Sequence, residues 1–385
     1  MSERKIRAWQ EAGLVDAAIA EKIRTWEAEH SRPIGTWAVV GLGALTIGLG
    51  LISVVAANWD AISGETRLAI HFMLMAALAL FLWLRLPRSG HNDHYHDGLL
   101  FVAAVLGLTF FGHLGQVYQS SAPLWQPLLV WLILFSPLLL LFGRGWTVAG
   151  LWMAGLIGTI WSHAEDYGHA WTVMGASGPT RSALYWGLIA CPPMAAAAFA
   201  ATMRDRSARP AFWRLLEQIA IAVIFAGLSL FTVIHGWDRH SDVLPGSAAI
   251  QSAALSGAAL AIGHARRTPS GSTTAALLIV AAFLHILQAM LPEMRGEARA
   301  WIGGLFFCAL WGAIAAGALH ARWRRIFQTA IALVALRIII LSFELNDDLL
   351  SSGVGLILSG LFALAVAWAT IRISGRHAPR READA

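Results

Sequence analysis

The stretch IFQTAIALVALRIIILSFEL, residues 326–345, decides how this chain folds. It is an apolar run of the length that crosses a bilayer as a helix. Arg337 interrupts it, and Glu344 lies seven residues further on, so both side chains share one helical face. Because a charge inside a membrane is costly, we expect Arg337 to face the bundle interior and to meet Glu344 or a polar group from another span. The alternative is an arginine that extends to the interface without a protein partner.

The composition of the whole chain indicates a membrane protein, as this stretch does. The chain has 385 residues, of which 57% are hydrophobic and only 13% charged, and its apolar residues form blocks of about twenty. These values predict an all-α, polytopic membrane protein. The net charge of +5 comes from basic residues between the blocks, so it indicates orientation and not nucleic-acid binding. Cys191 and Cys308 lie inside apolar blocks and predict neither a disulfide framework nor a zinc cluster.

Twelve segments are long enough to cross the membrane, some of them only with tilt or local thinning of the bilayer. They cover residues 34–56, 67–86, 98–118, 127–142, 146–162, 182–203, 214–236, 247–264, 274–291, 299–319, 326–343 and 353–373.

The distribution of basic residues predicts the orientation of these spans. If the N-terminus is cytoplasmic, 22 of the 28 Lys and Arg residues lie on the cytoplasmic side. Such an asymmetry favours cytoplasmic N- and C-termini and an even number of spans. We therefore expect twelve spans, with a bacterial inner membrane as the location.

An internal similarity suggests how the spans are organised. The motif FGHLGQ at 111–116 in span three returns as FLHILQ at 283–288 in span nine. A unit of six spans has both ends on one side, so its duplication gives parallel repeats. We expect two such repeats, at 34–204 and 205–373. A cytoplasmic helical hairpin at 1–33, in which Asp16 can cap the second helix, precedes them, and a cytoplasmic tail at 374–385 follows.

Polar residues inside the spans are the candidates for a functional site. In span three they recur on one helical face, which we expect to point into the bundle. One interpretation is hydrogen bonding between helices, and the other is a path for protons or a substrate. The candidate pathway residues are Thr109, His113, Gln116, His285, Gln288, Arg337 and Glu344.

Two histidine-bearing segments, expected to be loops, raise the question of metal binding. HNDHYHD covers residues 91–97 and HAEDYGH covers residues 163–169. Neither has a compact zinc-ligand spacing, so we expect solvated loops, with metal binding as the alternative. We expect no cofactor. The metal candidates of the first loop are His91, His94 and His96. Asn58, Trp59 and Asp60 after span one are predicted first as a turn at the outer interface and second as a separate site.

Two segments resemble known bacterial membrane families. The stretches GLGALTIGLGLISVVAANWD (41–60) and GHLGQVYQSSAPLWQPLLVWLILFSPLLLLFGRGW (112–146) are similar to domain-of-unknown-function family 2157. The stretch RIIILSFELNDDLLSSGVGLILSG (337–360) resembles family 4401. The resemblance implies a membrane architecture and no established activity. It marks as family positions Asn58, Trp59, Asp60, Gln116, Arg337 and Leu350, and it implies a small envelope protein as a possible partner.

The sequence therefore predicts an integral membrane protein, most simply a secondary transporter or permease in contact with the lipid bilayer. The alternative is an envelope assembly or scaffold protein without transport activity. We find no catalytic motif, no phosphate-binding loop and no acidic pair of an ATP-binding segment, and we expect that the chain is not an enzyme. The substrate is not specified by any motif.

The predicted orientation places Ser207 in the cytoplasm and Trp171 outside, because arginines surround the former and an acidic segment contains the latter. We expect alkaline phosphatase fused after Trp171 to be active and the same reporter fused after Ser207 to be inactive. If both fusions are active, or both are inactive, Ser207 and Trp171 lie on the same side of the membrane, which would contradict the twelve-span topology.

Overall fold

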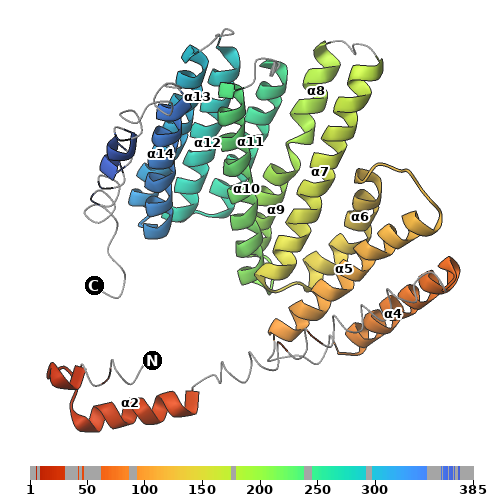
Figure 1. The fold of residues 1–385 in the computed structure, drawn as a ribbon, viewed down its shortest axis with the longest axis horizontal. Helices are drawn as coiled ribbons and strands as arrows, with labels where there is room; N and C mark the ends of the chain where they lie inside the picture. Colours follow the sequence, from red (N-terminus) through yellow and green to blue (C-terminus); the bar gives the residue numbers. More distant parts are fainter. Residues whose placement is uncertain are drawn as a thin grey trace. The chain divides into compact units, whose positions relative to one another are not determined.

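The computed structural model describes residues 9–30, 62–85, 93–174, 179–237, 245–291 and 297–344, with isolated positions before residue 47 and after residue 356. All regular secondary structure in these residues is helical, which confirms the predicted all-α class. The helices, drawn in Figure 1, are α2 (Ala17–His30), α4 (Gly64–Arg85), α5 (Asp93–Val117), α6 (Trp125–Phe142), α7 (Trp146–Met174), α8 (Pro179–Ile189), α9 (Pro192–Arg204), α10 (Pro210–Trp237), α11 (Pro245–Ala265), α12 (Pro269–Met290), α13 (Glu297–His320) and α14 (Arg324–Glu344).

The chain divides into two compact units, Met1–Arg67 and Leu68–Ala385. In the first unit a short helical segment ends at Gly13, whose φ of 69° is in the left-handed region. The Gly13 N–H donates to the Gln10 carbonyl at 3.0 Å, and the next N–H donates to the Trp9 carbonyl at 2.9 Å. This pair of hydrogen bonds is the usual way in which a glycine terminates a helix.

Helix α2 begins directly after this turn. The Asp16 carboxylate accepts a hydrogen bond from the backbone N–H of Ile19 at 2.6 Å, which confirms the predicted cap. The cytoplasmic placement of this segment stays a prediction. Apart from isolated positions, the first predicted span, 34–56, lies outside the described residues.

The second unit is a bundle of membrane-type helices. In the described residues, nine helical segments are long and apolar enough to cross a bilayer, and they coincide with nine of the twelve predicted spans. Helix α7 contains the predicted fifth span, 146–162, but is not among these nine. The twelfth span, 353–373, has only isolated described positions. A polytopic helical membrane protein is thus confirmed, whereas the count of twelve stays a prediction.

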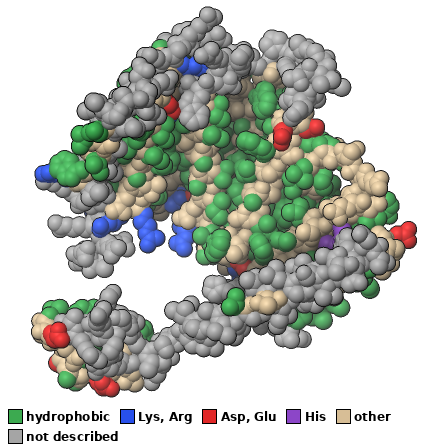
Figure 2. Space-filling model, in the orientation of Figure 1, with side chains coloured by type: hydrophobic (Ala, Val, Ile, Leu, Met, Phe, Trp, Pro, Cys, Tyr) green, Lys and Arg blue, Asp and Glu red, His purple; other side chains and the backbone are tan. Residues whose placement is uncertain are grey.

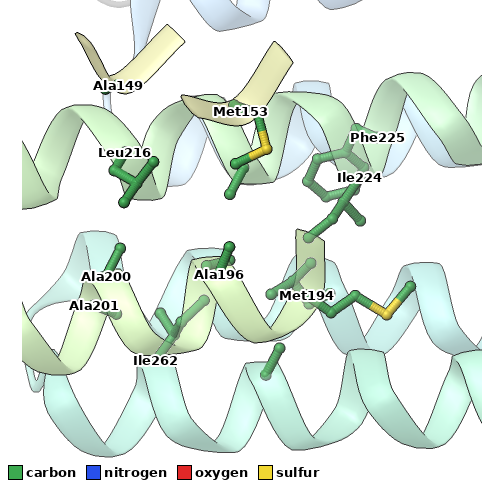
Figure 3. Close-up of a cluster of buried hydrophobic side chains, with 14 of the residues drawn as sticks. Ala149, Met153, Met194, Ala196, Ala200, Ala201, Leu216, Ile224, Phe225 and Ile262 are labelled. Atoms are coloured by element: carbon green, nitrogen blue, oxygen red, sulfur yellow. The ribbon is translucent and has the colours of Figure 1, made fainter. Parts of the chain in front are cut away.

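Small side chains allow the central helices to pack closely. Figure 3 shows alanines of α9 facing Leu216 and Ile224 of α10, with Met153 of α7 in the same layer. Ala197, Ala200 and other core alanines are fully buried. Close approach of helix backbones matters in a membrane, where association depends on van der Waals packing and not on exclusion of water from apolar surface. The core of the bundle therefore depends on the close contact that small side chains allow, and not on the size of the buried side chains.

The predicted sixth span, 182–203, is not one continuous helix. Helix α8 ends at Ile189 and α9 begins at Pro192. A proline has no N–H, and its ring collides with the carbonyl four residues earlier, so the two consecutive prolines at 192 and 193 break the helix. The Cys191 N–H and thiol donate to the carbonyls of Leu188 (3.0 Å) and Gly187 (3.2 Å), which would otherwise lack partners at the break.

The two segments expected to be loops are largely helical, so that expectation was wrong. Residues 163–169 lie within α7, which continues to Met174. Helix α5 begins at Asp93, so most of HNDHYHD forms its first turn. A helix that leaves the membrane has no reason to stop at the interface when its residues, such as alanine and glutamate, are good helix formers.

Helix α7 offers a direct test of this packing. A Cβ added at Gly155 would lie 2.3 Å from the Trp131 ring, whereas one added at Gly150 would meet nothing within 4 Å. Trp131 is fully buried and its indole N–H donates to the Ala104 carbonyl at 2.7 Å, so it cannot move aside freely. We expect Gly155→Ala to lower the free energy of unfolding by about 1–3 kcal/mol.

Gly150→Ala, the same exchange on the same helix, should leave stability unchanged or raise it by up to ~1 kcal/mol through helix propensity. Thermal unfolding of the full-length protein in detergent measures both variants. Equal stabilities for the two variants would contradict the close packing of Trp131 against Gly155.

Candidate functional site

One buried polar site surrounds His285 of α12. The residue is 4% exposed, and its Nε2 lies 2.7 Å from the Oε1 of Gln251 on α11. The Gln251 Nε2 in turn donates to the backbone carbonyl of Trp186 at 2.8 Å. Because that amide nitrogen donates, Gln251 Oε1 is the acceptor, and a neutral His285 carries its proton on Nε2. Its Nδ1 then has a lone pair that can take up a proton.

A small cavity of about 10 Å³ adjoins this histidine, lined by His285, Gln288, Thr232 and apolar side chains. Gln288 is 1% exposed, and in the described part of the chain neither its Nε2 nor the Nδ1 of His285 has a hydrogen-bond partner. Phe231 covers the imidazole edge-on, with ring centroids 4.7 Å apart. The volume is that of a single water molecule. The site therefore suits a proton or one small hydrogen-bonding species.

A second histidine site joins α4 to α5. His71 Nε2 lies 3.0 Å from the Leu106 carbonyl, and His71 Nδ1 lies 3.0 Å from His113 Nδ1. A carbonyl only accepts, so the neutral His71 is protonated on Nε2 and accepts a hydrogen bond from His113 through Nδ1. The two rings thus share one proton across a nitrogen-to-nitrogen hydrogen bond. Both ring nitrogens of His71 are therefore engaged, one by the Leu106 carbonyl and one by His113.

The rest of the predicted polar face of span three does not point into the bundle. Thr109 and Gln116 are both exposed, and His113 is only half-buried. The Thr109 hydroxyl donates to carbonyls of its own helix, at Val105 and Leu106, which satisfies it without a neighbouring helix. The expectation of an inward polar face is therefore wrong for Thr109 and Gln116. A threonine in a helix can donate to a carbonyl of the preceding turn, so its spacing alone does not show that it faces another helix.

Arg337 and Glu344 form the predicted pair. Arg337 is 3% exposed, and its Nη1 lies 2.7 Å from Glu344 Oε1. The guanidinium faces protein, which excludes the arrangement in which it reaches the interface without a partner. Among the described residues its Nε and Nη2 have no hydrogen-bond acceptor. The close approach of α13, where an added Cβ at Gly304 would lie 2.8 Å from Leu341, helps to enclose this part of α14.

The predicted pathway residues do not form one continuous site in the described structure. His113 bonds to α4, His285 and Gln288 lie at the α10–α12 cavity, and Arg337 pairs within α14. No hydrogen bond or ion pair among the described residues links these three places. The structure therefore presents three separate polar sites. A role for them as a single path stays a prediction.

The sequence analysis missed an acidic residue at the predicted cytoplasmic end of span seven. Glu217 of α10 is 1% exposed and pairs with two arginines, Arg266 at 2.5 Å and Arg204 at 3.5 Å. Arg266 also donates to the Ser270 hydroxyl at 2.9 Å. The available signal was a glutamate one turn inside an apolar block, with arginines in the loops on the same side. The network links α9 and α10 to the α11–α12 connection.

A second network at the same predicted end fixes the α6–α7 turn. The buried Asp97 of α5 accepts a hydrogen bond from the Arg144 backbone N–H at 2.9 Å. Arg209 donates to the backbone carbonyls of Leu140, at 2.7 Å, and Gly143. Burial lowers the pKa of Arg209, as does the nearby Arg144, whereas Asp97 acts in the opposite direction. These contacts give α6 a defined end and have a structural role.

The candidates for metal binding are resolved only in part. His96 is buried, and its Nε2 lies 3.1 Å from the Phe142 carbonyl, so this side chain is used in helix packing. The part of the chain that the structure describes contains no group of three His, Cys, Asp or Glu side chains suited to a metal ion. Among the metal candidates, His91 and the side chain of His94 lie outside the described residues. The predicted outer-interface turn formed by Asn58, Trp59 and Asp60 lies outside them as well.

The segment HAEDYGH belongs to an aromatic cluster at the predicted outer end of α7. His163 Nδ1 lies 2.7 Å from the Tyr185 hydroxyl, and Tyr185 stacks on Tyr167 with ring centroids 3.6 Å apart. The Trp125 indole N–H donates to Asp166 Oδ2 at 2.9 Å. These contacts connect α6, α7 and α8. The segment therefore acts first in helix packing and leaves its acidic side chains at the surface.

Comparison with known proteins reaches only the first part of the chain. Residues 7–148 match the family model described as Predicted membrane protein (DUF2157). This match confirms the resemblance for the N-terminal part, which includes the His71–His113 pair and α6. The resemblance of residues 337–360 to a second family stays a prediction. No curated protein and no solved structure matches the chain.

The Arg337–Glu344 pair predicts an asymmetry between two substitutions. Glu344→Leu leaves a buried arginine without its partner, and we expect it to lower the free energy of unfolding by about 3 kcal/mol. Arg337→Leu removes the buried charge itself and leaves a glutamate at the helix end, so we expect a change below about 1 kcal/mol. Unfolding of the full-length protein in detergent measures both.

The double variant R337L/E344L is the control, because it removes both charges together. It should recover most of the loss caused by Glu344→Leu. A double variant as unstable as Glu344→Leu alone would show that lost packing, and not the unpaired arginine, accounts for the effect.

Proposed function

We propose that this chain is a proton-coupled secondary transporter of the bacterial inner membrane, with His285 as the residue that takes up the proton. In this proposal the chain has no catalytic activity of its own. The main observation behind it is that Gln251 joins the interrupted sixth span to the buried His285 by hydrogen bonds. The described contacts that support it involve α8, α11 and α12.

The interruption of span six supplies the first argument. The last four carbonyls of a helix have no partner within it, and Trp186 carries one of these in α8. No water is available in the bilayer core, so Gln251 provides the missing donor. Discontinuous helices whose ends meet polar groups are characteristic of secondary transporters, where they form substrate and ion sites. The break thus lies where a transporter would need it.

The second argument is electrostatic. Protonation of His285 on Nδ1 creates a positive charge at a residue only 4% exposed, which is costly unless nearby groups compensate it. The C-terminal end of α8, reached through Gln251, carries the partial negative charge of the helix dipole. A conformation that brings further acceptors or an anionic substrate to the cavity would bind the proton more tightly. Such differential binding is what couples a proton to a conformational change.

The third argument comes from the motif shared by spans three and nine. In each, the histidine of the F-x-H-x-x-Q motif bonds to a side chain of the span directly before it, His71 for His113 and Gln251 for His285. The correspondence supports two six-span repeats in which the histidine contacts the preceding span at equivalent positions. Many secondary transporters are built from such internal repeats.

A scaffold role in envelope assembly is the second candidate, and one observation favours it. The first unit, Met1–Arg67, carries large apolar side chains that are exposed: Leu14 is 74% and Ile19 49% exposed. Exposed apolar residues on a separate unit suit docking to a partner or to the bilayer surface. A small envelope protein is the partner that this candidate would require.

The transport proposal is tested in everted membrane vesicles that contain the overproduced protein. Respiration acidifies the vesicle interior and quenches acridine orange, and a solute exchanged for protons restores the fluorescence. We expect one class among monovalent cations, organic ammonium ions, organic anions and neutral solutes to restore it faster than in vesicles without the protein. His285→Gln, which cannot be protonated, should reduce that rate at least tenfold.

His320→Gln is the matched control, because His320 is an exposed histidine at the end of α13. It should keep the rate of the unaltered protein. A His285→Gln variant with unchanged rate would remove His285 from the mechanism. Vesicles that respond to no solute class would contradict the exchange of a solute for protons and favour the scaffold.

A further inference from the structure

The cavity of about 10 Å³ beside His285 lies where α12 meets α10 and α13. His285 and Gln288 line it from α12 and Thr232 lines it from α10, and its other described lining residues are apolar. His285 is 4%, Gln288 1% and Thr232 6% exposed. Polar groups buried this deeply are almost always hydrogen-bonded, yet His285 Nδ1 and Gln288 Nε2 have no partner in the described part of the chain. Their partner therefore belongs in the cavity that they line.

The other hydrogen bonds of these residues fix what each one offers to the cavity. His285 donates through Nε2 to Gln251, so the neutral ring offers a lone pair at Nδ1. The Thr232 hydroxyl donates its only proton to the Ser229 carbonyl at 2.7 Å, so its oxygen also offers a lone pair. Gln288 offers the N–H groups of Nε2. An occupant that satisfies all three residues donates two hydrogen bonds and accepts one.

These requirements and the small volume select a neutral molecule. A halide ion has no proton to donate to the His285 lone pair. A metal cation prefers several oxygen ligands and would meet the N–H groups of Gln288. No Asp, Glu, Lys or Arg is among the described residues that line the cavity, so nothing there balances the charge of an ion. Water is by far the most abundant molecule of this size, and it has two protons to donate and two lone pairs.

The surroundings of the cavity are those of a membrane span. The helices α10, α12 and α13 are all long and apolar enough to cross a bilayer. Figure 2 shows hydrophobic side chains spread over the flank of the bundle, with several Lys and Arg side chains at its lower edge. Phe231 covers the imidazole of His285 edge-on. A water molecule bound at this depth depends on the protein for its hydrogen bonds, so the protein also sets its orientation.

We propose that this cavity binds one water molecule, and that Gln288 and Thr232 position it as the group through which His285 receives its proton. The water site depends only on these contacts, whereas its role in proton uptake rests on the proposed transport function.

One water molecule can serve both charge states of His285. Beside the neutral ring it donates to Nδ1 and to Thr232 and accepts from Gln288. A proton that arrives as hydronium passes from the water oxygen to Nδ1 and leaves a neutral water molecule behind. That water then accepts from the new Nδ1 N–H and from Gln288 and still donates to Thr232. Rotation of the water therefore satisfies the imidazole before and after protonation.

Gln288→Met tests the water site by the sign of its effect on thermal unfolding. Methionine has nearly the shape of glutamine but no N–H to donate. If the water is bound, the exchange removes its donor, and we expect the melting temperature of the full-length protein in detergent to fall by about 2–4 °C. Without the water, the same exchange removes an unpartnered buried amide and raises the melting temperature. A melting temperature that is unchanged or higher would overturn the water site.

Thr232→Val has a matched control in Thr274→Val. Both threonines are 6% exposed, and both donate to a carbonyl of their own helix, that of Ser229 or of Ser270. Of the two, only Thr232 lines the cavity. We therefore expect Thr232→Val to lower the melting temperature more than Thr274→Val does. Equal losses would remove Thr232 from the site.

The acridine orange assay tests the role in proton uptake. Gln288→Met and Thr232→Val should slow the proton exchange at least tenfold, Thr232→Ser should keep the rate because it retains the hydroxyl, and Thr274→Val should have no effect. Unchanged rates in the first two variants, beside an active unaltered protein, would overturn the role of the water in proton uptake. An inactive unaltered protein would contradict the proposed function and this role with it, while the melting temperatures would still decide the water site.

Discussion

Hydrogen-bonding groups in a bilayer must find partners within the protein, because each unsatisfied group costs several kcal/mol in hydrocarbon. In the described structure this constraint acts most visibly on backbone carbonyls. His71 uses the Leu106 carbonyl, Gln251 that of Trp186, and Arg209 those at the end of α6. In each case a long polar side chain reaches another helix. The polar residues of the bundle are thus explained first by the backbone, and only their remaining atoms are available for function.

The two ends of the bundle differ in how their buried polar residues are used. At the predicted cytoplasmic end, Glu217 meets two arginines and Asp97 holds the α6–α7 turn, so the charges there are paired within the protein. In the predicted outer half, His285 and Gln288 keep polar atoms without partners beside a cavity. Paired charges stabilise one arrangement of helices, whereas unpaired buried atoms retain the capacity to bind. Trp213 Nε1 and Glu217 Oε2 at the first end also have no hydrogen-bond partner among the described residues, so the cavity beside His285 is what distinguishes the outer half.

Much of the architecture was predictable, because it depends on the length and spacing of apolar blocks. Nine predicted spans coincide with membrane-type helices, and the spacing of Arg337 and Glu344 correctly predicted their pairing. The break in span six was not predicted, although two adjacent prolines indicate it, because the prediction used only the length of the apolar block. The orientation of Thr109 and Gln116 was also missed. Helical spacing places residues on one face, but whether a neighbour covers that face depends on tertiary packing.

The site around His285 shows what sequence reasoning cannot supply. His285 and Gln288 were identified from their motif, but Gln251, the partner of His285, lies in an alanine-rich span and has no motif of its own. Its importance arises only because the break in α8 leaves a carbonyl at the same depth. The two prolines therefore have an effect at a distance: they free an acceptor, the acceptor fixes the orientation of Gln251, and Gln251 fixes the tautomer of His285. Replacing Gln251 with an apolar residue would remove the printed partner of both the Trp186 carbonyl and the His285 imidazole, so one side chain satisfies the carbonyl at the helix break and sets which nitrogen of His285 carries the proton.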